Sequence, residues 1–139
     1  MDDVAVTKAL CQVLAARTGW AWRPDGPAYT SAEVGVVYGA LPASPDRAVA
    51  VTVYWADDEL QTGLAVRRAQ LRFRGGRGRP DGADELAGVA FTTLHGLARV
   101  AGLSLVTRVL VAHLGADDNA RQERADSYQI VLDNPEASS

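Results

Sequence analysis

Two stretches joined by a short polar segment decide the fold: residues 48–74 read AVAVTVYWADDELQTGLAVRRAQLRFR. Apolar side chains alternate along residues 48–55, and the alternation resumes along residues 65–73. A period of two predicts β-strands, because successive side chains of a strand point to opposite faces of a sheet. In the second stretch arginine and glutamine fill the outward positions, which favours an antiparallel strand covered on one face only. The acidic residues 57–59 are predicted to form the turn between the two strands.

Apolar residues at helical spacing predict one helix on each side of this strand pair. Residues 3–18 carry one apolar stripe between a pair of aspartates that can cap a helix and Gly19, a natural stop. A second stripe predicts a helix over residues 81–102, ended by Gly102. The two stripes consist of Val6, Leu10, Val13 and Leu14, and of Leu86, Ala90, Leu94, Leu97 and Ala101.

Further strands are expected at residues 34–39, 105–114 and 127–132, with a proline-rich turn at residues 41–46 and a polar connection from Asp117 to Ala125. The element order is then α-β-β-β-α-β-β. This order predicts an α+β fold in which a single, mainly antiparallel sheet of about five strands carries two helices on one face. The expected single domain is divided into an N-terminal helix (1–19), an extended connector (20–33), a sheet region (34–133) that contains the second helix, and a frayed tail (134–139).

The composition is that of one ordinary globular domain. The chain has 139 residues, 47% of them hydrophobic and 22% charged, and a net charge of -3. A chain of this length can bury roughly 70% of its unfolded surface, so it needs no disulfide or metal for a core. The single cysteine, Cys11, has no disulfide partner in the chain. A slightly acidic chain without a basic leader or a long apolar run is expected to be soluble, not exported, and not a general nucleic-acid binder.

Residues that carry chemistry are sparse. The chain has two histidines and one cysteine, and no nucleotide-binding or hydrolase motif. His113 is followed by Asp117 and Asp118, but neighbouring aspartates in a turn do not converge as metal ligands must, so a solvated acidic turn is the preferred interpretation. The glycine-rich loop 75–80 is expected to be flexible, and acids at the start of the next helix would repel a phosphate. We therefore expect no catalytic residue, no metal and no cofactor.

Charge is distributed unevenly along the chain. Residues 67–79 contain six arginines and no acid, whereas residues 117–139 contain six acids and two arginines. Opposite charges on two surfaces favour contact between identical copies and fix their register. A solvated strand face with a mobile loop and a phosphate-binding patch are the alternatives. The candidate interface residues are Arg68, Arg72, Arg74, Arg77, Arg79, Asp117, Asp118, Arg121, Glu123 and Asp126.

Several segments together resemble a known family. They are VYGALPASPD (37–46), the strand 49–54, RAQLRFR (68–74) and LGADDNARQERADSY (114–128). From about residue 29 to residue 132 the chain is similar to the tail terminator or minor capsid proteins of long-tailed, siphovirus-type bacteriophages and prophages.

The resemblance implies a structural protein and not an enzyme. Members of that family cap the head-proximal end of the tail tube as a ring, expected to be hexameric, which stops tube growth and provides the surface for head-tail joining. The implied partners are other copies of the chain, the tail tube protein and the head-tail connector proteins, with DNA only as cargo in the lumen and no membrane. The implied location is the tail-neck junction of a virion assembled in the host cytoplasm. A head-completion or connector protein of the neck, and a small nucleic-acid-binding module that uses residues 67–79, are the competing interpretations.

Overall fold

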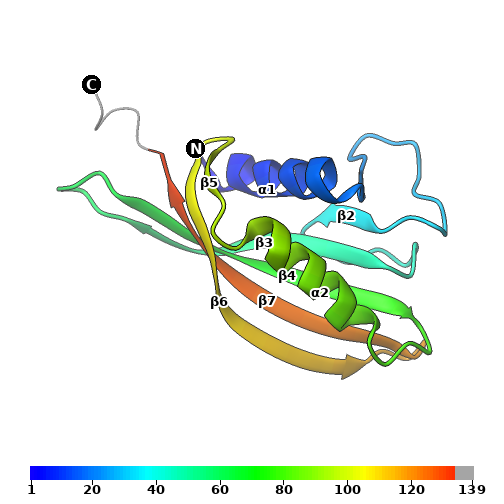
Figure 1. Ribbon diagram of the computed structural model, residues 1–139. Helices are drawn as coiled ribbons and strands as arrows, with labels where there is room; N and C mark the ends of the chain where they lie inside the picture. Colours follow the sequence, from blue (N-terminus) through cyan, green and yellow to red (C-terminus); the bar gives the residue numbers. More distant parts are fainter. Residues whose placement is uncertain (134–139) are drawn as a thin grey trace.

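The computed structural model describes residues 1–133 (Figure 1). The predicted fold class is confirmed: two helices lie on one face of a single mixed, mostly antiparallel sheet, which has seven strands and not about five. The expected frayed tail, residues 134–139, lies outside the described residues. The elements are α1 (Asp3–Thr18), β1 (Ala21–Trp22), β2 (Gly35–Tyr38), β3 (Ala48–Asp58), β4 (Ala65–Arg77), α2 (Gly82–Leu94), β5 (Ala98–Val100), β6 (Leu103–Ala116) and β7 (Arg121–Leu132).

The strands follow the order β1-β2-β3-β4-β7-β6-β5 across the sheet. The first three are parallel to one another, and every later pairing is antiparallel. The two strands that the sequence did not predict are short and lie at the margins. β1 is part of the connector 20–33, and β5 lies within the region predicted as the second helix.

Helix α1 has the predicted bounds. Asp2 caps it, because its carboxylate accepts a hydrogen bond of 2.8 Å from the backbone N–H of Ala5. Gly19 ends it in the left-handed conformation, with φ of 82°. The predicted stripe is buried, and Leu10 and Leu14 have no exposed surface.

Helix α2 is shorter than predicted. It ends at Leu94 and not at Gly102. Gly96 adopts a φ of 84° just after the helix, so the chain turns there and returns as β5. Leu97 still packs against the core, but it does so from a turn. The helical spacing of Leu97 and Ala101 is therefore coincidental. Gly96, and not Gly102, is the glycine that marks the end of the helix.

Strand boundaries also differ from the prediction, most of all at four places. β3 continues through residues 57–58, so the hairpin turn lies at residues 59–64 and not at the acidic residues. β4 continues through residues 75–77, the first part of the predicted flexible loop. β6 extends to Ala116, and β7 begins at Arg121, six residues before the predicted start. Cross-strand hydrogen bonds hold these polar segments in strands although their side chains carry no hydrophobic alternation.

The core lies between the helices and the sheet. Its largest fully buried side chains include Phe73, Leu71 and Tyr128, which project from the neighbouring strands β4 and β7. The predicted inward residues of β4 are thus confirmed. Ala48 and Ala50 are buried as well, although they project from the opposite face of β3. The turn 41–46 covers that face, as the contacts of Arg74 show below.

The hydroxyl of Tyr128 provides a stability test of this core. The side chain is fully buried, and its Oη has no hydrogen-bond partner among the described residues. Burial also raises the pKa of Tyr128. Because an unpaired buried hydroxyl costs about 1–3 kcal/mol, Tyr128→Phe should preserve or raise the free energy of unfolding, by about 1 kcal/mol in urea denaturation. A loss of that size would show that the hydroxyl makes a stabilising hydrogen bond.

Candidate assembly surfaces

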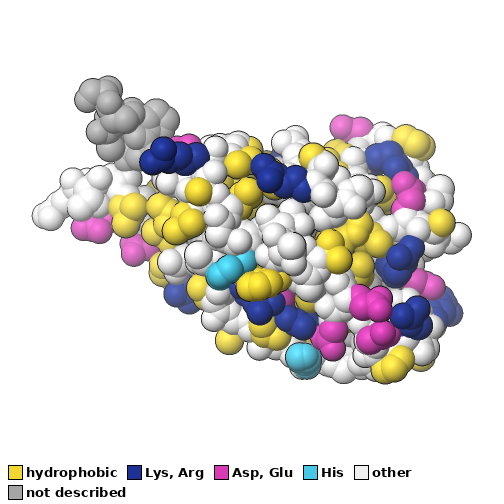
Figure 2. All heavy atoms as spheres, viewed as in Figure 1, with side chains coloured by type: hydrophobic (Ala, Val, Ile, Leu, Met, Phe, Trp, Pro, Cys, Tyr) yellow, Lys and Arg dark blue, Asp and Glu magenta, His cyan; other side chains and the backbone are white. Residues whose placement is uncertain are grey.

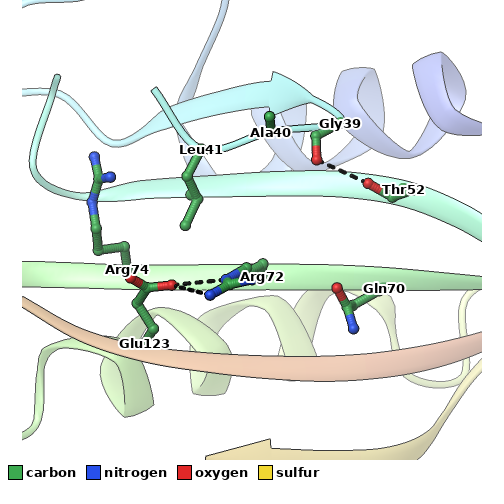
Figure 3. Close-up of a pocket in the computed structure, with 8 residues that line it drawn as sticks. All are labelled: Gly39, Ala40, Leu41, Thr52, Gln70, Arg72, Arg74 and Glu123. Atoms are coloured by element: carbon green, nitrogen blue, oxygen red, sulfur yellow. Dashed lines mark hydrogen bonds and ion pairs between the residues drawn. The ribbon is translucent and has the colours of Figure 1, made fainter. Parts of the chain in front are cut away.

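A polar hollow of about 410 Å³ lies on the face of the sheet opposite the helices (Figure 3). It contains the ion pair between Arg72 of β4 and Glu123 of β7, in which Nε and Nη2 of Arg72 both lie 2.7 Å from the same carboxylate oxygen, Oε1. Strand register makes this pair possible, because Glu123 lies opposite Arg74, which is two residues from Arg72 and therefore on the same face of the sheet. The remaining lining residues are Gly39, Ala40, Leu41, Thr52, Gln70 and Arg74. Glu123 offsets the charge of Arg72, and Arg74 is the second basic side chain of the lining.

Arg74 is buried and binds the turn 41–46. Only 4% of it is exposed, and its guanidinium donates to the backbone oxygens of Pro45 (2.7 Å) and Asp46 (2.8 Å). Burial lowers its pKa. These bonds hold the turn 41–46 against the sheet, which explains why this arginine points out of the strand and is nevertheless inaccessible.

The two charged segments predicted to meet between copies are neighbours within one chain. β4 ends at Arg77 and continues into residues 78–79, residues 117–120 connect β6 to β7, and the Gly78 N–H donates to the Ala120 oxygen at 2.9 Å. Arg121 is 6% exposed and pairs with Asp117 at 2.8 Å and Asp46 at 3.1 Å. Both segments therefore form a single charged end of the sheet.

Exposure differs among the residues at this charged end. Arg77 pairs with Asp46, and Arg79 pairs with Asp81 and Glu85, but both arginine side chains are about 60% exposed. Asp118 is exposed on the turn. These three, Arg77, Arg79 and Asp118, are the predicted interface residues whose charges remain accessible here. For all ten candidate interface residues, a role in contacts between copies stays a prediction.

Asp126 lies on the other side of the sheet, below α2. It has no exposed surface and accepts hydrogen bonds from Arg124, the shorter at 2.8 Å, while Arg108 approaches to 3.5 Å. The Arg108 guanidinium also lies 4.0 Å from the ring centre of Phe91. Arg68, on the opposite face, stacks over Trp55 at 5.0 Å. Asp126 thus holds one buried network together, and its position in the chain gave no indication of that burial.

Exposed apolar side chains mark surfaces that the sequence analysis did not single out. They gather on β6 and on the hairpin formed by β3 and β4, which projects past the helix layer in Figure 1. Figure 2 shows hydrophobic and acidic side chains along this hairpin and intermixed basic and acidic ones at the opposite end. The sequence does carry a signal for this surface: residues 109–112 are apolar at four successive positions, although helices cover only one face of the sheet. The residues are Tyr54, Trp55, Leu60, Leu64, Leu105, Val109, Leu110, Val111 and Leu114.

The side chains weighed above as metal ligands, His113, Asp117 and Asp118, do not converge on one point. The Asp117 carboxylate is occupied by Arg121 and by the backbone N–H of Asn119, while His113 lies 3.5 Å from Asp84. Within residues 1–133, no three His, Cys, Asp or Glu side chains are grouped so that they could hold a metal ion. Neither described helix has the length and hydrophobicity to cross a membrane.

An α+β domain whose charged groups pair with one another and whose apolar side chains remain exposed on strands is typical of a subunit of an assembly. The family model of the bacteriophage tail terminator protein matches residues 13–134, so the chain belongs to the bacteriophage tail terminator family. Proteins of this family are structural virion components and not enzymes, as the sequence resemblance predicted.

The fold also matches a solved structure. A chain of the virion of a native gene transfer agent particle aligns with a TM-score of 0.59 at 16% sequence identity, covering 94% of this chain and 96% of that one. At that identity the likeness concerns the fold. None of the curated proteins matches the sequence.

Proposed function

We propose that the chain caps the head-proximal end of a phage tail tube as a ring, expected to be hexameric, which stops tube polymerisation and provides the surface for head-tail joining. The observation that carries the proposal is the family match over residues 13–134. The proposed partners are other copies of the chain, the tail tube protein and the head-tail connector proteins. The proposed location is the tail-neck junction, and DNA passes through the ring only as cargo.

Two unlike ends of the sheet support this role. At one end lie the accessible charges of Arg77, Arg79 and Asp118, and at the other the β3–β4 hairpin exposes Leu60 almost completely and Leu64 by half. A capping ring must bind the tube on one axial face and reject further tube subunits on the other. Strands that run roughly along the ring axis would place these two ends on opposite axial faces. The charged end then contacts one axial neighbour, and the β3–β4 hairpin, with its exposed apolar and acidic side chains, contacts the other.

The arginine-rich segment gives little support to a nucleic-acid-binding module. Arg67 pairs with Asp3 and Asp58, and Arg72 pairs with Glu123. Arg74 is buried. Phosphate binding depends on basic side chains that are free to displace counterions. A connector protein of the neck remains the competing structural role, and the experiment below separates the two.

The test is to add the purified chain to growing tubes of the tail tube protein. A terminator should arrest elongation and appear in electron micrographs as a ring at one tube end, with the mass of several chains in native mass spectrometry. Tubes without the chain should grow to variable lengths. Unimpeded elongation, together with binding of the chain to a head-side connector protein, would contradict the proposal and favour the connector role.

A further inference from the structure

We propose that neighbouring copies in the ring join through the two stepped edges of the sheet: the uncovered second half of β6 in one copy docks against the β1–β2 edge of the next. The same rotation places β5 of the first copy beside the uncovered half of β3 in the second. This inference rests on the proposed ring. It concerns the surfaces that close the ring, for which neither the family match nor the fold likeness names residues.

One step lies on the β6 edge. On the side away from β7, β5 pairs only with Leu103 and Leu105. The chain after α2 continues this cover as far as Arg108, whose backbone N–H donates to His95 Nδ1 at 3.0 Å. From residue 109 to residue 116, no strand of the described chain pairs with β6 on this side. This edge therefore protrudes in its first half and is recessed in its second half.

The opposite edge of the sheet carries a second step, at β3. β2 pairs with residues 48–51 of β3, and β1 pairs with β2. Thr52 lengthens this cover by one residue, because its hydroxyl donates to the Gly39 oxygen at 3.0 Å. From residue 53 to residue 58, β4 is the only strand in the described part of the chain that pairs with β3.

The two steps lie at the same level of the sheet. The last covered residue of β6 and the first uncovered residue of β3 belong to one row of register partners, which consists of Arg108, Tyr128, Ala69 and Val53. Toward the charged end from this row, the sheet is six strands wide, from β1 to β6. Toward the hairpin it is five strands wide, from β3 to β5. One edge therefore protrudes where the other is recessed, so the two edges have complementary outlines.

A ring about an axis roughly along the strands brings equal levels together, because rotation preserves height along its axis. Tyr38 of β2 and Val111 of β6 are the two ends of one register row. Trp22 of β1 and His113 of β6 are the ends of another. Figure 1 shows β2 and β6 on opposite margins of the sheet. Each copy uses both edges once, as a closed head-to-tail ring requires.

The uncovered half of β6 is apolar and open to water. Leu110 is 60% exposed, and Val109, Val111 and Leu114 are each exposed by more than a third. Residues 109–116 contain no proline and no lysine, which natural proteins place on edge strands to prevent association with another chain. Exposed apolar side chains that adjoin one another mark a surface of contact with another protein.

The β1–β2 edge offers a hollow of about 260 Å³ to these side chains. Its lining is mostly aromatic and apolar and consists of Trp22, Arg23, Pro24, Tyr29, Val37 and Tyr38. The charge of Arg23 is already paired, because its Nη1 lies 2.8 Å from Glu33 Oε2. Its guanidinium also lies 5.1 Å from the ring centre of Tyr29. Aliphatic side chains can therefore cover this hollow without leaving an unpaired charge in the contact.

The residual charges of the two edges are complementary. Residues 20–33, which include β1 and the connector, contain Arg23 and two acids, Asp25 and Glu33. β6 contains Arg108 and His113, and no acid. Unlike charges favour contact between these two different edges over pairing of β6 with a second β6. The occupant that fits the β6 edge is therefore the β1–β2 edge of a second copy.

The test is cysteine cross-linking of the ring on tail tubes. The variant carries Tyr38→Cys and Val111→Cys, which are exposed ends of one row and lie on the same face of the sheet. A bismaleimide of about 10 Å reach spans two strand spacings. The natural Cys11 is fully buried, and burial raises its pKa to about 12, so it should not react. We expect a ladder of covalent species up to the full ring from this variant and only monomer from each single variant.

The matched control pairs Val111→Cys with Leu60→Cys. Leu60 is 97% exposed, so its thiol is at least as accessible, but it lies on the hairpin at the other end of the sheet. The control should give no ladder. A ladder as strong as that of the Tyr38→Cys, Val111→Cys variant would show that the reagent reports random collisions, and it would contradict the edge contact.

Three other results would overturn the inference. Rings that form without a ladder would disprove the edge contact and leave the proposed function standing. Dimers from the Val111→Cys single variant would indicate pairing of two β6 strands about a two-fold axis. A chain that forms no oligomer even on tube ends would refute the ring and the edge contact together.

A charge placed on the β6 edge gives an independent readout. Leu110→Glu should leave the thermal midpoint of the isolated chain unchanged and abolish ring formation on tube ends in electron micrographs. The matched control is Val89→Glu, at a position 43% exposed on α2, away from both edges, which should form rings normally. Normal ring formation by Leu110→Glu, or equal loss in both variants, would contradict the edge contact.

Discussion

Gly75→Ala should lower the midpoint of thermal unfolding by roughly 10 °C. An added Cβ at residue 75 would lie 2.6 Å from two backbone atoms of Gly82 and 2.7 Å from the backbone nitrogen of Ala83. These atoms form the start of α2, so they cannot move aside without displacing the helix. Overpacking costs up to about 3 kcal/mol, and a clash between backbone segments belongs at the upper end of that range.

The matched control is Gly88→Ala in the same helix. Apart from its chain neighbours and the backbone of its own helix, a Cβ at residue 88 would have no heavy atom within 4 Å, and alanine favours a helix over glycine by about 1 kcal/mol. Calorimetry should therefore show a lower midpoint for Gly75→Ala and a slightly higher one for Gly88→Ala. Equal midpoints for Gly75→Ala and the natural chain would show that β4 and α2 do not approach as closely as described.

Asp126→Asn should reduce the free energy of unfolding by about 3 kcal/mol, because breaking a buried ion pair by removing one partner costs about 3–5 kcal/mol. The substitution preserves the size of the side chain and removes the charge that Arg124 and Arg108 share. Arg124 retains its contact with Asp84 at 3.0 Å, which places the expected loss at the lower end of the range.

Urea denaturation at neutral pH measures this loss, with Asp118→Asn as the control. Asp118 is exposed on the turn after β6, so its substitution should change the free energy of unfolding by less than about 0.5 kcal/mol. If both variants were equally stable, Asp126 would not be the charge that holds Arg108 and Arg124 beneath α2.

Hydrophobic periodicity was sufficient to predict the helix–sheet layering. The stripe of α1 and the alternation of β4 each follow a single period, and burial matches both. The prediction was wrong where hydrogen bonds and not hydrophobicity decide the structure. Residues 121–126 form a strand because they pair with β4 and β6, and their polar side chains gave no sign of it.

The candidate interface shows the same limit. The sequence indicated which residues carry charge, but not which charges would pair within the chain, as Arg72 does with Glu123. Pairing of this kind depends on strand register, and a shift by one residue would direct the same side chains to opposite faces. Which strand edges stay free depends on the strand order, and the short β1, β2 and β5 leave β3 and β6 partly uncovered. Local sequence patterns do not encode that order.

The length distribution of tails on particles that lack this chain tests the terminator role most directly. Without a cap, tube growth should continue, so electron micrographs should show tails of variable and excessive length, separate from filled heads. Restoring the chain should return tails of one length joined to heads. Uniform tails attached to DNA-filled heads in its absence would contradict the role.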